Sequence, residues 1–133
     1  MTELVVDTSA AIAILTGEPL GGAVADALDA ERPLISAATL VELGIVLEAR
    51  LGPVGTAVVE RFLRAGGLEV SAVDREVADG AIDGWRRYGK GRHPAGLNYG
   101  DCFVYALASI EGAPVMSTDD GFTHTDLATL DLT

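Results

Sequence analysis

The chain has 133 residues, which suits a single domain, and 49% of them are hydrophobic, which is enough for a substantial core and excludes global disorder. The formal charge is −11, from 9 basic and 20 acidic residues. This charge argues against binding nucleic acid through bulk electrostatics, because phosphate binding normally depends on a basic surface. It is compatible with a protein that binds divalent cations or a basic partner.

Cysteine content and hydropathy favour a cytoplasmic protein. Cys102 is the single cysteine, so an internal disulfide is excluded, and its apolar neighbours indicate a buried filler rather than a nucleophile. Asp7 interrupts the apolar segment at the N-terminus, and no stretch approaches the ~18–20 apolar residues of a membrane span. We therefore expect no membrane association.

Strand and helix patterns alternate along the chain. Apolar runs predict strands, and apolar residues at helical spacing, bounded by Gly, Pro and capping residues, predict helices. The predicted strands are 4–6, 33–36, 68–73 and 114–117, with a short edge strand at 128–132, and the predicted helices are 10–15, 22–30, 38–51, 54–64, 75–88 and 99–111. This order predicts one domain over 1–133, of α/β class: a three-layer α/β/α domain with a central parallel sheet of four to five strands.

Acidic residues fall where such a sheet would bring them together. Asp7 ends the first strand, and Asp119 and Asp120 follow the fourth. Asp101 lies in the first turn of the helix before that strand, and Glu42 lies within an apolar helix with no basic residue three or four positions away. Because sites in open parallel sheets lie outside the carboxyl ends of the strands, we expect these carboxylates to converge.

A converging set of carboxylates indicates a metal site. Like charges at ~4–6 Å repel unless a cation compensates, and oxygen ligands suit Mg²⁺ or Mn²⁺. Such an ion can activate water for attack on a phosphodiester. The alternative is structural: Asp7 as a helix cap, Asp101 as a favourable charge at a helix N-terminus, Glu42 on an exposed helix face, and the late aspartates as turn residues. Thr8 and Thr118, next to the carboxylates, are candidates for substrate contact.

A local basic cluster is the second candidate feature. Arg86, Arg87, Lys90 and Arg92 are four of the nine basic residues within seven positions, and His93 follows. Lys90 and Arg92 are predicted to bind substrate phosphates beside the metal site. The alternative is a solvated helix end, where cations suit the helix dipole.

The motifs as a set resemble a known family. The segments VVDTSA, TLVELG, GKGRHPAGLNYGDCFVYALA and FTHTDL occur in order over nearly the whole chain, and they resemble the PIN domains of VapC toxins. The resemblance implies a metal-dependent endoribonuclease toxin of a type II toxin–antitoxin system that cleaves tRNA or ribosomal RNA. It also implies a homodimer, a VapB-like antitoxin partner, and an acidic quartet of Asp7, Glu42, Asp101 and a late aspartate that binds Mg²⁺ or Mn²⁺.

The late aspartate departs from the family pattern. Relatives read Gly-Asp-Asp-Phe, whereas this chain reads Asp119-Asp120-Gly121-Phe122. Counting from Phe122 or from Thr118 places Asp120 at the first family aspartate, so we favour Asp120 over Asp119 as the metal ligand beside Asp7 and Asp101. Asp126 also matches the family, and it is left out of the core site because it can instead fix the loop.

Other functions fit less well. A receiver domain needs an aspartate at the end of the third strand and a lysine ending a late strand, but the only lysine is Lys90, in a loop. A phosphomonoesterase usually carries an Asp-x-Asp pair, and Asp7 is followed by Thr8-Ser9. The more serious alternative is a non-catalytic PIN-like metal-binding scaffold that acts only through its antitoxin. The four carboxylates argue against it, since a scaffold gains nothing from their repulsion.

Overall fold

The structure is a computed structural model that describes residues 2–132. Its strands are β1 (Glu3–Val6), β2 (Arg32–Ser36), β3 (Glu69–Ser71) and β4 (Val115–Met116). Its helices are α1 (Thr8–Leu15), α2 (Gly21–Ala30), α3 (Ala37–Leu51), α4 (Val54–Gly66), α5 (Arg75–Tyr88) and α6 (Tyr99–Glu111), with a 3₁₀ turn, η1 (Gly121–His124). Among these described elements, no helix is long and apolar enough to cross a membrane.

The four strands form one parallel sheet in the order β3-β2-β1-β4. β1 lies between two neighbours, with Val5 in register with Leu34 of β2 and with Val115 of β4. Because the strands are parallel, the residues that follow β1, β2 and β4 all emerge at one edge. The order of elements therefore brings Asp7 beside residues more than a hundred positions later.

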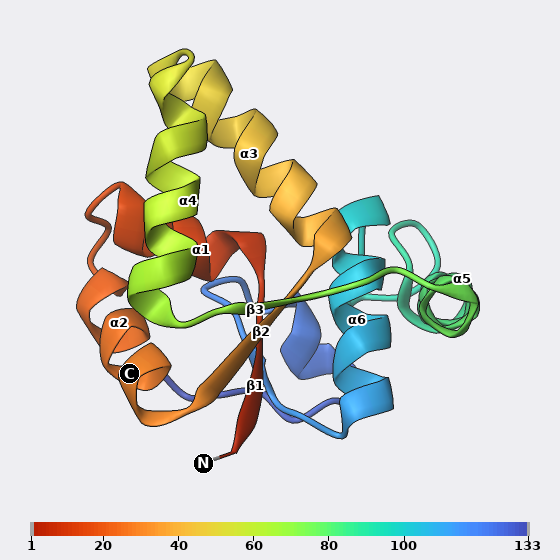
Figure 1. Cartoon of the computed structure of the whole chain (residues 1–133). Helices are drawn as coiled ribbons and strands as arrows, with labels where there is room; N and C mark the ends of the chain where they lie inside the picture. Colours follow the sequence, from red (N-terminus) through yellow and green to blue (C-terminus); the bar gives the residue numbers. More distant parts are fainter. Residues whose placement is uncertain (1, 133) are drawn as a thin grey trace.

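Alternate strand residues face opposite layers, as the two-residue period of a strand requires. Val5, Leu34 and Val115 pack with α5 and α6, whereas Leu4 and Met116 pack with the helices of the other layer. Figure 1 shows α5 and α6 on one side of the sheet, α1, α2 and α4 on the other, and the α3–α4 hairpin projecting beyond them. The predicted three-layer α/β/α architecture is confirmed.

The expected edge strand at 128–132 was wrong. This segment makes one isolated bridge, between Thr129 and Val115. Val115 N donates to Ala128 O at 3.0 Å, and Leu130 N donates to Val115 O at 2.9 Å. β4 is only two residues long, so it offers the final segment few backbone groups with which to pair as a regular strand.

Close packing of α3 on α4 requires glycine at one position. A Cβ atom at Gly55 would lie 2.6 Å from the carbonyl carbon of Leu47. Gly44, within α3, would meet nothing within 4 Å. Replacing each of these glycines with alanine therefore separates the effect of helix packing on stability from the effect of helix propensity.

We expect Gly55→Ala to lower the free energy of unfolding by about 1–3 kcal/mol, because backbone must move to accept the methyl group. The matched variant Gly44→Ala should raise it by roughly 0.5–1 kcal/mol, because alanine restricts the unfolded chain and favours helix. Urea denaturation measures both. Equal effects of the two substitutions would contradict the close α3–α4 contact.

Candidate active site

Asp7 is a buried carboxylate at the end of β1, with a side chain only 3% exposed. It occupies the N-cap position of α1, but its side chain makes no capping hydrogen bond. Instead Oδ2 accepts hydrogen bonds from Ser9 Oγ at 2.7 Å and Ser117 Oγ at 3.0 Å. Burial raises the pKa of Asp7, the two hydroxyls oppose this, and the charge of Asp119 adds to it. The backbone of Ser9, in the first turn of α1, also lowers the pKa of Asp7, so the side chain interacts with the start of α1 as well as with the two hydroxyls.

The two serines join the ends of β1 and β4. Their Oγ atoms lie 3.0 Å apart, Thr118 N donates to Ser9 Oγ at 3.0 Å, and Asp119 N donates to Ser117 Oγ at 3.1 Å. This network holds the backbone of Asp119 close to Asp7. Sequence reasoning missed Ser9 and Ser117 as site residues; the available signal was a serine shortly after each of two neighbouring strands.

Glu42 turns toward α6 rather than toward solvent. Its Oε1 accepts a hydrogen bond from Thr8 Oγ1. A Cβ atom at Gly100 would lie 2.7 Å from Glu42 Oε2, so the carboxylate rests against the first turn of α6. Glu42 is half-buried and lines a groove between α3 and α6, so its carboxylate is held by Thr8 while it stays accessible. Thr8 is 8% exposed, and its hydroxyl is hydrogen-bonded to Glu42. Contact with substrate stays a prediction for Thr8 and Thr118.

Asp101 combines a helix cap with a place in the acidic group. Its Oδ2 accepts from Asn98 N at 3.0 Å, and Asn98 Oδ1 accepts from Asp101 N at 2.8 Å, which completes a capping box. Its pKa is raised to about 6, first by burial and then by the charges of Asp7, Glu42 and Asp119, against the lowering effect of the Asn98 hydrogen bond. The electrostatic coupling connects residues from four separate parts of the chain.

The late aspartate that couples to this group is Asp119. Its charge raises the pKa of both Asp7 and Asp101. Asp120 instead begins η1, and its carbonyl accepts hydrogen bonds from Thr123 N and Oγ1. Motif counting favoured Asp120 because it ignored the tie between Asp119 and Ser117. The electrostatic coupling favours Asp119, and the assignment of the late metal ligand stays a prediction.

The donor set suits a hard cation without forming a finished cage. Across residues 2–132, no three acidic, histidine or cysteine side chains are placed to hold one ion together. All four coupled donors are carboxylates, and their mutual repulsion is the kind that a divalent cation relieves. Mg²⁺ typically keeps several waters and takes one or two carboxylates directly. The carboxylate donors are therefore of the chemical kind that hard divalent cations such as Mg²⁺ or Mn²⁺ prefer.

The basic cluster divides between two roles. Arg92 stacks over Trp85, with its guanidinium carbon 4.5 Å from the ring centroid, and Nε donates to Arg86 O at 3.3 Å. Lys90 lines a groove together with Asn98, the capping partner of Asp101. Lys90 thus shares a groove with the residue that caps α6, and contact of Lys90 and Arg92 with phosphate stays a prediction. His93 Nδ1 accepts from Ala95 N at 3.0 Å, so the loop is internally ordered.

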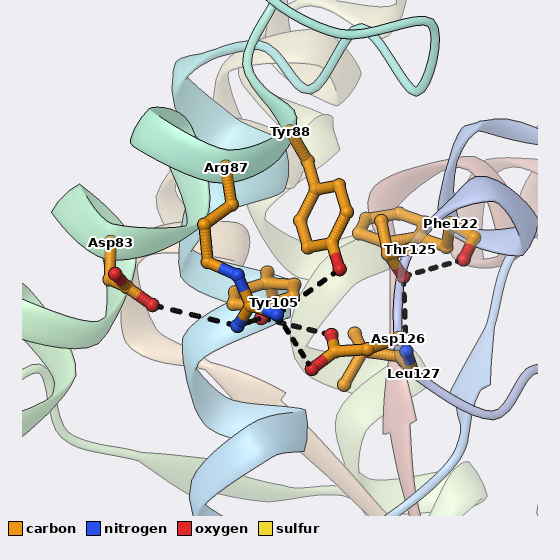
Figure 2. Close-up of polar contacts among 8 residues, drawn as sticks. All are labelled: Asp83, Arg87, Tyr88, Tyr105, Phe122, Thr125, Asp126 and Leu127. Carbon is orange, nitrogen blue, oxygen red and sulfur yellow. Dashed lines mark hydrogen bonds and ion pairs between the residues drawn. The ribbon is translucent and has the colours of Figure 1, made fainter.

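Asp126 fixes the C-terminal segment. Figure 2 shows Asp126 beside Tyr105 of α6 and Arg87 of α5. Tyr105 Oη donates to Asp126 Oδ1 at 2.9 Å, and Arg87 Nη1 donates to Tyr105 Oη at 2.9 Å. Arg87 also pairs with Asp126 at 3.4 Å and with Asp83 at 3.8 Å. Arg87 is therefore a structural residue, and Asp126 belongs to this anchor rather than to the acidic group.

The raised pKa of Asp101 predicts a pH-dependent stability for the metal-free protein. The folded state binds the Asp101 proton up to about pH 6, whereas the unfolded chain loses it near 3.8, so stability falls as pH rises from about 4 to 6. Asp101→Asn keeps an oxygen for the cap and removes the charge. It should raise the free energy of unfolding at pH 7 by roughly 1–2 kcal/mol, a value discounted because the carboxylate is partly solvated.

Urea denaturation in EDTA between pH 4 and 8 measures this effect. Asp29→Asn, at an exposed position of α2, is the control and should leave the pH profile unchanged. If Asp101→Asn shows the wild-type decline between pH 4 and 6, the decline does not come from Asp101.

Comparison with known proteins agrees with this geometry. The PIN domain model matches residues 4–127. Ribonuclease VapC of Mycolicibacterium smegmatis is 48% identical over 129 residues, covering 94% of this chain and 98% of that protein. Ribonuclease VapC30 of Mycobacterium tuberculosis is 43% identical over 130 residues, covering 97% and 99%. The DNA-bound VapBC structure from Salmonella typhimurium superposes with a TM-score of 0.80 at 23% identity, over 100% of both chains. The chain belongs to the PIN-domain family, among the VapC ribonucleases.

Proposed function

We propose that the protein is a metal-dependent endoribonuclease, the toxin of a type II toxin–antitoxin pair. The observation that carries the proposal is the coupling of Asp7, Glu42, Asp101 and Asp119 at the carboxyl edge of the parallel sheet. Four carboxylates held together cost stability unless they serve a ligand, and that ligand is expected to be Mg²⁺ or Mn²⁺. The ribonuclease names of the closely similar relatives support RNA as the substrate.

The proposed role of each side chain follows from its contacts. Asp7 and Asp101, the two carboxylates with raised pKa, would bind the cation, with Asp119 completing the acidic pocket. Ser9 and Ser117 orient the Asp7 carboxylate, and Thr8 orients Glu42. When bound, a divalent ion lowers the pKa of a coordinated water and offsets the charge of the phosphodiester. Glu42, oriented by Thr8, would serve as the base that accepts a proton from the attacking water.

The substrate is proposed to be a structured RNA, a tRNA or a ribosomal RNA. One structural neighbour, a Mycobacterium tuberculosis toxin with a TM-score of 0.76, is described as cleaving the sarcin-ricin loop; at 17% identity it shares the fold with this chain. The −11 charge means that phosphate contacts must be local. Lys90 and Arg92 are the basic residues proposed to make them.

The partner is proposed to be a VapB-like antitoxin, and the active form a homodimer. The structural neighbours include VapBC complexes from Salmonella typhimurium and Rickettsia felis. The acidic pocket and the overall charge would steer a basic antitoxin segment toward Asp7 and Asp101. An arginine suits this role because its guanidinium pairs with carboxylates through two hydrogen bonds.

Loss of one metal-binding carboxylate tests the catalytic proposal. Asp7→Asn should reduce RNA cleavage in Mg²⁺ or Mn²⁺ by at least about 100-fold, which corresponds to a loss of roughly 2.7 kcal/mol of transition-state stabilisation. The measurement is cleavage of total RNA by the purified toxin, with EDTA as the metal-free reference and Asp29→Asn as the control. RNA cleavage by the wild type that persists in EDTA would contradict the proposed metal dependence. Absence of any wild-type cleavage, with antitoxin binding intact, would favour the scaffold.

The two late aspartates should differ in importance. Asp119→Asn should lower kcat more than Asp120→Asn does, because Asp119 couples electrostatically to Asp7 and Asp101. Initial rates at saturating Mn²⁺ on one RNA compare the two variants directly. A larger loss in Asp120→Asn would restore the assignment from motif counting.

A further inference from the structure

The loop that follows β4 carries both late aspartates, and it is held at its two ends. Residues 117–126 form this segment, which we name the late loop. At its start, Ser117 Oγ donates a hydrogen bond to Asp7 Oδ2 at 3.0 Å and accepts one from Asp119 N at 3.1 Å. At its far end, Asp126 contacts side chains of α5 and α6. The position of the late aspartates therefore depends on both ends of the late loop.

Three side chains form the anchor at the far end of the late loop. Tyr105 Oη donates to Asp126 Oδ1 at 2.9 Å and accepts from Arg87 Nη1 at 2.9 Å (Figure 2). Arg87 Nη2 donates to Asp126 Oδ2 at 3.4 Å. Tyr105 is buried, and burial together with the hydrogen bond to Asp126 raises the pKa of its hydroxyl, although Ser109 and Arg87 oppose this effect. Asp126 is thus held through both of its carboxylate oxygens.

Hydrogen bonds and packing make the stretch between the late aspartates and Asp126 a compact unit. Thr123 N donates to Asp120 O at 3.1 Å. Thr125 donates to Phe122 O twice, from N at 3.2 Å and from Oγ1 at 2.7 Å. Phe122 is buried in the core that α6 forms with the sheet. A shift of Asp126 would therefore displace the aspartates at the other end of this unit.

Helix α6 connects the anchor to the acidic group. Asp101 and Tyr105 lie about one turn apart on this helix, and side chains at positions i and i+4 project from the same face. Asp101 belongs to the coupled carboxylates, and Tyr105 holds the end of the late loop. One helix therefore carries a carboxylate of the proposed metal site and also fixes the loop that carries another.

We infer that the Arg87–Tyr105–Asp126 anchor positions the late loop so that its aspartate meets Asp7 and Asp101 at a spacing that suits a divalent cation. The inference rests on the proposed metal-dependent function and adds three residues that act on that site. They would work through the loop rather than bind the cation, so they are positioning residues. Mg²⁺ requires near-ideal octahedral geometry, and ligands have to be held within about 0.5 Å of it, so a small displacement of the loop weakens binding.

Mn²⁺ binding in the absence of RNA tests the anchor apart from catalysis, and electron paramagnetic resonance of the free ion gives the dissociation constant. Tyr105→Phe removes one hydroxyl and keeps the ring in the core. It should weaken Mn²⁺ binding by about 10-fold, the lower end of the range for residues that orient metal ligands. Asp126→Ala should weaken it at least as much. Asp126→Asn should retain most of the affinity, because its amide oxygen can still accept from Tyr105.

Asp79→Ala is the matched control, because Asp79 also pairs with an arginine of α5, Arg75, and both side chains of that pair are exposed. It should bind Mn²⁺ as the wild type does. RNA cleavage gives a second readout: in Tyr105→Phe, the Mn²⁺ concentration for half-maximal activity should rise by the same factor as the dissociation constant. Excess Mn²⁺ should then restore kcat to within a few-fold of the wild type.

The outcomes separate this inference from the proposed function. A purely structural anchor would lower the free energy of unfolding in urea and leave the Mn²⁺ affinity of folded Tyr105→Phe and Asp126→Ala unchanged, which would overturn the inference alone. An equal loss of affinity in Asp79→Ala would also overturn it, because affinity would then follow net charge. A wild type that binds no Mn²⁺ would overturn the proposed metal dependence and this inference with it. If Asp126→Ala does not fold, Tyr105→Phe still decides.

Discussion

The buried carboxylate of Asp7 is the constraint to which the rest of the site is adapted. A carboxyl group on a residue that is only 3% exposed has lost most of its hydration, and the hydroxyls of Ser9 and Ser117 replace only part of it. The two serines come from segments that follow neighbouring strands, so satisfying this carboxylate also joins the ends of β1 and β4. A single buried charge thus connects the sheet to the loop that carries Asp119.

The acidic group places demands on the helices around it. α6 begins at a capping box in which Asp101 serves the helix, while its charge faces Asp7, Glu42 and Asp119. Gly100 leaves the space that the Glu42 carboxylate occupies. The residues that stabilise the start of α6 are therefore largely those that form the acidic pocket. Repulsion among the carboxylates at this edge lowers the stability of the metal-free fold.

The basic residues of α5 and the loop after it have different roles. Arg87, Tyr105 and Asp126 tie the C-terminal segment to α5 and α6, whereas Arg92 stacks on Trp85 and Lys90 lines the groove beside Asn98. The basic cluster of the sequence is therefore divided between an anchor and residues that remain candidates for phosphate contact.

The sequence by itself determined the layer architecture and the identity of most acidic residues. Periodicity and strand–helix alternation are local properties, and parallel strands must deliver Asp7 and the residues after β4 to one edge. Only the tertiary structure shows that the backbone of Asp119 is tied to Ser117, a residue that itself contacts Asp7 across 110 positions. The same holds for the short final bridge in place of a fifth strand, for Arg87 as an anchor, and for the groove beside Asn98. Each of these arises from side chains that meet through packing between distant segments, and no local pattern encodes such meetings.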